Sequence, residues 1–287
     1  MPVDNRRITV PENTTCYNLF TKSKSFKNRC EHFINTSGKR PDGRKAEEHR
    51  KIFLQMNVVT QAKGSAYIEV GKTKVIVSVF DPRGIPNNSD YKQNGELYCE
   101  FKYAPFSCTK RRLHQQDSEE KQKSLIMKRS LESAVCRHEF PNFQVDIYAL
   151  VLENDGSTLS AAITAAGIAL AQAGIPMYDI ITAAEFGYQD GTYVLDPTSQ
   201  EERICSVTMQ ENNDSANEFK PQGIIILSML LTHQQVSGFH ANGNLRLSDV
   251  NNSFDVISRA TADIANLVKK NLVKQVIKNV QENAIKK

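Results

Sequence analysis

A glycine turn in front of a segment rich in small residues is the feature of this sequence that could hold an anion. The turn reads Asp155-Gly156-Ser157-Thr158, and alanines recur at helical spacing from there up to Gly174. Main-chain N–H groups at a helix start, together with the helix dipole, attract phosphate groups. The same residues fit a purely structural interpretation, with Gly156 in the turn and Ser157 as the N-cap. The pattern therefore predicts a helix start here and leaves its ligand open.

A basic run, Lys110-Arg111-Arg112, could do a different kind of chemistry. It follows a strand-like segment and the turn Pro105-Phe106-Ser107. With Lys63, Arg83 and the nearby Tyr103, it could contact an RNA backbone in a salt-dependent way that ignores base sequence. An ordinary solvated loop explains the same charges equally well.

The sequence gives no support for metal or cofactor chemistry. Its six cysteines, at positions 16, 30, 99, 108, 136 and 205, include no CxxC and no Cys/His pair at zinc spacing. We expect them to be free thiols, mostly buried. His114, His138 and His233 have no neighbours that suggest a triad or a metal site. A P-loop, a dinucleotide-binding glycine pattern and a GxSxG elbow are all absent, so we expect no cofactor and no metal.

The order of the expected elements indicates an α/β or α+β domain with a mixed sheet. Periodicity predicts strands at 66–70, 74–80, 97–103, 143–152, 180–188, 192–195, 204–210 and 223–230. It predicts helices at 117–136, 158–173 and 250–280, the first with a capping box. Small residues on every face of the second helix let it lie close to a sheet, so we expect it to be central. The polar stretch 211–220 is expected to be an exposed loop.

Charge is distributed unevenly along the 287 residues. Residues 1–50 hold 11 Lys or Arg against 6 Asp or Glu, and residues 269–287 hold six Lys against one Glu. The intervening body carries a net charge of −6. Basic ends can attract RNA or an acidic partner, although solvated Lys-rich ends are common. Since the sequence has neither an apolar signal core nor a run long enough to span a bilayer, we expect an intracellular soluble protein without membrane contact.

Three stretches, taken together and in order, resemble one protein family. They are Gln61–Val75, the turn at Asp155-Gly156-Ser157 with its helix through to Asp179, and Leu195-Asp196-Pro197-Thr198. In this order and spacing they resemble the RNase PH family of phosphate-dependent 3′→5′ exoribonucleases, from about Arg40 to the C-terminal helix. Residues 1–40 are polar and lack sustained periodicity, so we expect an irregular arm there. The resemblance implies a single RNase PH-like α+β domain at 41–287.

The resemblance further implies a place in the core ring of the eukaryotic RNA exosome. The expected partners are other RNase PH-like subunits, cap proteins on one face of the ring, and RNA in its channel. The expected locations are nucleus, nucleolus and cytoplasm, and the expected role includes ribosomal RNA processing. In such enzymes inorganic phosphate attacks the last phosphodiester of RNA, so the site must neutralise two anions with N–H groups and arginines, and must supply a carboxylate.

The cationic positions of that site are altered. The family reads Gly-Ser/Thr-Arg at the glycine turn, and here Thr158 replaces the arginine. The family's arginine pair at the preceding helix start corresponds to Ser118 and Glu119, with Glu120 next. A bidentate arginine supplies two charged hydrogen bonds of about 1.5–3 kcal/mol each, so a hydroxyl and a carboxylate are poor substitutes.

The carboxylates match the family only in part. Asp196 and Glu202 take the places of two acids six residues apart, the second one methylene longer than expected. Val207-Thr208-Met209 stands where a further acid is expected, and Pro197 makes Asp196 equally suited to a turn. A misplacement of about 1 Å can cost about a hundredfold in rate.

Together these changes predict a silent site and a non-catalytic ring subunit. One alternative is a working phosphorolytic exoribonuclease that uses the two acids with a relocated cation. The other is a stand-alone RNA-binding module. Release of nucleoside diphosphate from RNA would favour the first, and a stable monomer that binds RNA tightly would favour the second.

Overall fold

The computed structural model describes residues 40–85, 91–109, 111–189, 191–207 and 221–285, and only the backbone at 279 and 282–285. All of them lie in one compact unit, His32–Lys287. Several expectations fall outside the described residues: the polar loop at 211–220, all of the arm expected at 1–40 except Arg40, Lys110, and Cys16 and Cys30.

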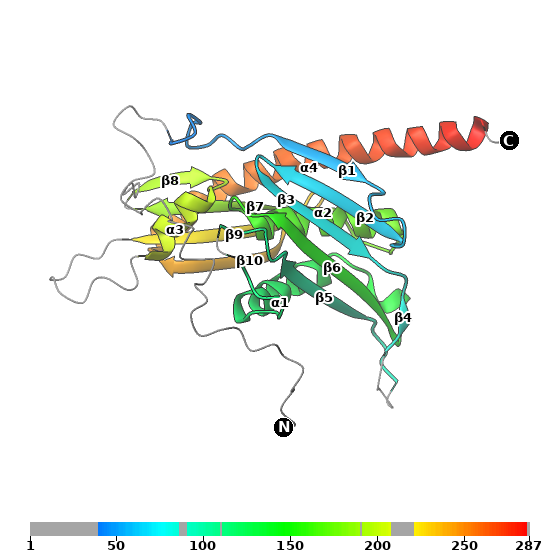
Figure 1. Cartoon of the computed structure of the whole chain (residues 1–287). Helices are drawn as coiled ribbons and strands as arrows, with labels where there is room; N and C mark the ends of the chain where they lie inside the picture. Colours follow the sequence, from blue (N-terminus) through cyan, green and yellow to red (C-terminus); the bar gives the residue numbers. More distant parts are fainter. Residues whose placement is uncertain (1–39, 86–90, 110, 190, 208–220, 286–287) are drawn as a thin grey trace, which may run out of the picture. The chain divides into compact units, whose positions relative to one another are not determined.

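The first sheet is mixed (Figure 1). Its strands are β1 (Ile52–Met56), β2 (Gly64–Val70), β3 (Thr73–Val79), β4 (Arg83–Gly84), β5 (Glu96–Tyr103) and β6 (Phe143–Glu153). Strands β1, β2, β3 and β6 pair antiparallel in that order, and the short β4 pairs with the start of β6. Strand β5 runs parallel to β6, with Tyr103 opposite Val151. The tight turn between β2 and β3 has Gly71 at φ +60°, as the sequence predicts.

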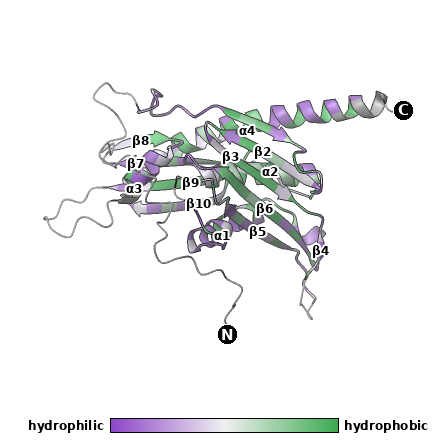
Figure 2. Ribbon diagram, in the orientation of Figure 1, coloured by the Kyte–Doolittle hydropathy of each residue, from purple (hydrophilic) through white to green (hydrophobic). Residues whose placement is uncertain are grey.

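The second sheet is antiparallel, in the order β10-β9-β7-β8. Its strands are β7 (Ile181–Gln189), β8 (Thr192–Leu195), β9 (Gln222–Leu230) and β10 (Gln235–Asn244). Every residue of β7 is buried, because this strand lies between β9 and β8 and is covered by helices. Figure 2 shows β9 largely in the hydrophobic colour.

Helix α2 (Thr158–Ala173) packs against β2 and β3 of one sheet and against β7 of the other. The approach is close: a Cβ on Gly64 would lie 2.2 Å from the carbonyl oxygen of Ala169, and one on Gly167 would lie 2.8 Å from that of Ile181. Larger side chains would therefore push the sheets apart. The predicted central helix is confirmed, and its small residues are the reason that two sheets can share it.

Three further α-helices and one short 3₁₀ helix surround the sheets in the described part of the chain. Helix α1 (Ser118–Glu132) lies along β5, with the predicted capping box at Asp117 and Glu120. A 3₁₀ helix, η3, spans Arg137–Glu139. Helix α3 (Ser199–Val207) contacts β9 and β7, and α4 (Leu247–Ile285) packs on β7 and β9. Among the described helices, none is long and apolar enough to cross a bilayer.

Two expectations from the sequence differ from the structure. Residues 204–207 end helix α3 and do not begin a strand, so the strand predicted at 204–210 is wrong in its described part. The acidic first turn with Glu201 and Glu202 suits a helix N-terminus, and that signal outweighs the alternation of apolar residues that begins at Cys205 and Val207. Strand β10 was not predicted, because its polar and glycine-rich sequence lacks strand periodicity.

Candidate functional site

The glycine turn at the start of α2 is closed by a carboxylate from α3. Gly156 has φ +88° and Ser157 has φ +53°, so both are in the left-handed region. The main-chain N–H of Ser157 donates to Oε1 of Glu202 at 2.6 Å. Ser157 is the N-cap by position, as predicted, but its hydroxyl makes no capping bond and donates instead to the carbonyl of Pro197 at 3.2 Å. The acid of α3 therefore takes the place in which an anion would bind this turn.

A second buried carboxyl lies beside the first. Glu185 on β7 is 5% exposed and its side chain is hydrogen-bonded to Glu202. Burial first, and then the charge of Glu202, raise the pKa of Glu185 well above its ordinary value. Burial also raises the pKa of Glu202, against the Ser157 N–H and the charge of Lys123, which favour its ionised form. Two carboxyls this close disfavour ionisation of both at once, and the Ser157 N–H and the charge of Lys123 favour the ionised form at Glu202.

Asp196 is bound by an arginine from the other side of the turn. Arg50 donates through Nε to Oδ2 at 2.7 Å and through Nη2 to Oδ1 at 2.6 Å, and its main-chain N–H donates to Oδ2 at 3.0 Å. The same guanidinium donates to the carbonyls of Asp155 and Gly156 at 2.7 and 3.1 Å. Burial alone would raise the pKa of Asp196, but these hydrogen bonds and the charge of Arg50 hold it well below its usual range. Asp196 is thus a permanent structural anion.

A second buried arginine, Arg40, holds the first turn of helix α3 in place. Arg40 is 1% exposed and reaches Glu201 through Nε at 2.9 Å and through Nη2 at 2.5 Å. It also donates to the carbonyls of Leu195 and Asp196 at 2.7 and 3.0 Å. These bonds join the end of β8 to the first turn of α3, the turn that carries Glu202.

Thr158, where the family has arginine, faces a tyrosine and a lysine. Its Oγ1 lies 2.9 Å from the hydroxyl of Tyr103, and the ammonium of Lys123 donates to that hydroxyl at 2.6 Å. Burial would lower the pKa of Lys123, but Tyr103 and Glu119 outweigh that effect and raise it. A cation is therefore present one side chain away from the expected position, on α1.

Of the two acids at the start of α1, Glu119 forms ion pairs with both nearby cations. Glu119 accepts from Lys123 at 2.9 Å and from Arg112 at 3.0 Å, and the guanidinium of Arg112 lies 4.2 Å from the ring centroid of Tyr103. Glu120 binds backbone only, at the N–H groups of Asp117 and Tyr103. Ser118 is exposed and begins the helix.

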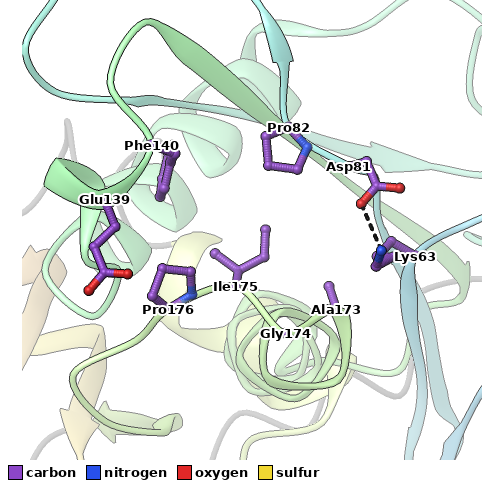
Figure 3. A pocket seen from close by; sticks show the side chains of 9 residues that line it. All are labelled: Lys63, Asp81, Pro82, Glu139, Phe140, Ala173, Gly174, Ile175 and Pro176. Atoms are coloured by element: carbon purple, nitrogen blue, oxygen red, sulfur yellow. Dashed lines mark ion pairs between the residues drawn. The ribbon is translucent and has the colours of Figure 1, made fainter.

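The predicted RNA-binding residues lie in two separate places. Arg111 and Arg112 follow β5, and Arg112 lies over the ring of Tyr103, whose hydroxyl contacts Thr158 at the start of α2. Arg83 pairs with the start of β6, at the other end of the sheet, and its side chain binds Asp146 at 2.6 Å. Lys63 lies near the C-terminal end of α2, where it binds Asp81 at 3.2 Å on the rim of a cavity of about 310 Å³ (Figure 3). The structure does not bring the two sets together.

Known proteins resemble this chain in both sequence and fold. The model of the 3′ exoribonuclease family, domain 1, of RNase PH type, matches residues 48–176. The exosome complex component MTR3 of Homo sapiens is 34% identical over 217 residues, which cover 70% of this chain and 75% of that protein. The chain belongs to the RNase PH family. The RRP41 homolog of Arabidopsis thaliana, also an exosome complex component, is 41% identical over 166 residues, 57% of this chain and 69% of that protein.

The fold is that of the RNase PH family as well. The crystal structure of Rrp46 from rice superposes with a TM-score of 0.66 at 24% identity, covering 81% of this chain and 99% of that one. Within the family, Arg6-Arg7-Ile8, Ala62–Val70 and Pro176-Met177-Tyr178-Asp179 predict the mRNA transport regulator type. The likeness to MTR3 confirms that prediction.

Arg50, Lys123 and Glu185 are among the residues of this RNase PH-like site that were missed from the sequence. Arg50 gave no signal, because its partner Asp196 is 146 residues away. Lys123 is one of several lysines on an amphipathic helix. Glu185 could have been noticed, since it is an acid within the otherwise apolar start of a strand. Among the described residues, no group of three or more His, Cys, Asp or Glu side chains is arranged to hold a metal ion.

Proposed function

We propose that this protein is a non-catalytic structural subunit of the RNA exosome ring. It completes the channel, contacts the backbone of RNA with basic side chains, and binds neighbouring RNase PH-like subunits and cap proteins. In that role it supports 3′→5′ RNA processing and degradation, ribosomal RNA included, by nucleases elsewhere in the complex. The family membership and the exosome relatives support the ring assignment.

The hydrogen bond from Ser157 to Glu202 is the observation that supports an inactive site. Phosphate would need the N–H that Glu202 accepts at 2.6 Å, and it would approach the negative charge of that carboxylate. A hydrogen bond to a charged group contributes about 1.5–3 kcal/mol, and phosphate must replace it without the family's arginine. The turn therefore has its anion already, supplied by the chain itself.

The remaining groups do not restore catalysis. Both oxygens of Asp196 are engaged by Arg50, and the side chain is 1% exposed, so it neither transfers a proton nor reaches a substrate. The two relocated cations, Lys123 and Arg112, are both paired with Glu119. The carboxylates of Glu119 and Glu202 leave no net positive charge to bind two phosphoryl groups.

A phosphorolysis assay tests the proposal directly. Purified protein is incubated with 3′-labelled RNA, magnesium and inorganic phosphate, and nucleoside diphosphate is measured. We expect none above background. Phosphate-dependent release that disappears in the Glu202→Ala variant would show a working enzyme and overturn the proposal.

The ring assignment has its own test. Affinity purification of the tagged chain, followed by native mass spectrometry, should give other RNase PH-like subunits at equal stoichiometry. A chain that remains monomeric and binds RNA tightly without partners would instead be a stand-alone RNA-binding module.

A further inference from the structure

The last turns of α4 carry an apolar stripe that the described part of the chain does not cover. Val273, Val276, Ile277 and Val280 are 52, 60, 53 and 62% exposed. Their spacing of three and four residues places them on one side of the helix. In Figure 1 this part of α4 extends past the strands of the first sheet.

This stripe is not the margin of the face that packs on the sheet. Ile257, Ile264 and Val268 are at most 6% exposed and define the side of α4 that faces β7 and β9. At 3.6 residues per turn, Val273 and Val280 lie about half a turn away from that side. Gln275, about two turns beyond Val268 on the same side of the helix, is still half-buried while its neighbours Val276 and Ile277 are exposed. Helix α4 therefore has two apolar faces, and the described residues cover only one of them.

The residue types in the stripe are a poor choice for an exposed helix. Valine and isoleucine are branched at Cβ, lose side-chain freedom in a helix and have lower helix propensity than Ala, Lys, Glu or Gln. Solvent-facing positions in a helix gain nothing from them. Their recurrence at 273, 276, 277 and 280 matches the seam of a helix–helix contact.

The charges beside the stripe define the partner. Lys270 and Lys274 border it on one side, Lys269 lies at its N-terminal end, and all three are exposed. Between residues 266 and 281 the sequence has no acid. Pairing of two copies of this helix would bring lysines together, which like-charge repulsion disfavours. We propose that this stripe is a docking site for an acidic amphipathic helix of a partner protein.

Membranes and RNA fit the stripe less well than a helix does. A helix that lies on a membrane presents a broad apolar face with aromatic residues. This stripe is narrow, consists of only four side chains and contains no aromatic residue. RNA would use the lysines and leave the valines exposed. Four side chains about half exposed cover far less than the about 800 Å² that each partner buries in a stable interface. The contact therefore adds to an association held elsewhere.

Site-specific photo-crosslinking in the complex formed by the full chain in cells tests the proposal. A diazirine amino acid replaces Ile277, and in a control sample it replaces Leu247, which is 77% exposed at the other end of α4. After purification through the tagged chain and irradiation, the linked peptide is sequenced by mass spectrometry. We expect the Ile277 probe to link a partner segment with apolar residues at heptad spacing and an excess of Asp and Glu. The Leu247 probe should not link that segment.

A charge-reversed chain, Lys270→Glu with Lys274→Glu, should lower the yield of that product at least fivefold. Lys51→Glu, a reversal at an exposed residue directly before β1, should leave it unchanged. Linkage to lipid, to RNA, to a second copy of this chain or to a segment without the acidic excess overturns the proposal. So does an unchanged yield after charge reversal, or no product beyond that of the Leu247 control. Circular dichroism of each variant verifies that the helices are intact.

Discussion

The main-chain N–H of Ser157 and the carboxylate of Glu202, 45 residues apart, meet at 2.6 Å across the start of α2. One belongs to the turn that could hold an anion, and the other belongs to the pair of acids that could act on a substrate. Their contact satisfies both groups within the chain. A buried carboxylate neutralises the positive end of the central helix α2. The N–H groups at this helix start, which could bind a phosphate, are therefore used inside the protein core.

Replacing each acid of the buried pair separately should have unequal effects on stability. Glu202→Gln removes the ionised acceptor of the Ser157 N–H and should lower the free energy of unfolding at pH 7 by about 1.5–3 kcal/mol. Glu185→Gln keeps a neutral hydrogen-bonding group beside Glu202 and should not lower it. Denaturant unfolding of both variants measures the difference. Equal losses would contradict the assignment of the charge to Glu202.

Stability should fall as pH rises above about 5, through the raised pKa of Glu185. In the unfolded chain this carboxyl releases its proton near its ordinary pKa of about 4.3. In the folded protein, burial and the charge of Glu202 keep the proton on. The contribution of Glu185 is thus fully present below the unfolded pKa and is lost as pH rises through the folded one. Unfolding measured from pH 5 to 8 should show a steeper decline for the natural chain than for Glu185→Gln, and parallel curves would contradict this.

Asp196→Asn should destabilise the protein strongly. Asparagine tolerates the left-handed backbone at this position, φ +53°, so the change tests the charge alone. Leaving Arg50 buried without its anion should cost about 3–5 kcal/mol. The matched control is Asp81→Asn, which breaks an exposed pair with Lys63 and should cost at most about 1 kcal/mol. If the two variants unfold at the same denaturant concentration, Asp196 is not the structural anion described above.

The parts of the fold that could be predicted from the sequence are those specified by local pattern. The alanine-rich helix at 158–173, the hairpin at Gly71 and the capping box at Asp117 depend on neighbouring residues, and all three are confirmed. Strand β10 depends on pairing with β9 for its conformation. Its own residues give little strand signal, so only the assembled sheet reveals it.

In the candidate site, too, some features can be predicted from the sequence and others only from the structure. The loss of arginine at Thr158, Ser118 and Glu119 can be seen in the sequence, because the resemblance fixes those positions. The ion pair between Arg50 and Asp196 joins residues that are 146 positions apart in the sequence. No local sequence pattern predicts such a contact. Sequence comparison thus detects missing cations, whereas only the structure identifies the carboxylate that replaced their ligand.

Among the candidate RNA contacts, Arg111 should matter most in the assembled complex. It is exposed, whereas Arg112 is paired with Glu119 and lies over the ring of Tyr103. Each phosphate contact with single-stranded RNA contributes about 0.7 to the slope of log affinity against log salt. Arg111→Ala should reduce the steepness of that slope by about this amount. The affinity should fall by the same factor for every RNA sequence. Fluorescence anisotropy across a salt series measures both. Lys63→Ala, measured in parallel at the other end of α2, shows whether the RNA also reaches that end. An unchanged slope for Arg111→Ala would place the RNA path away from the start of α2.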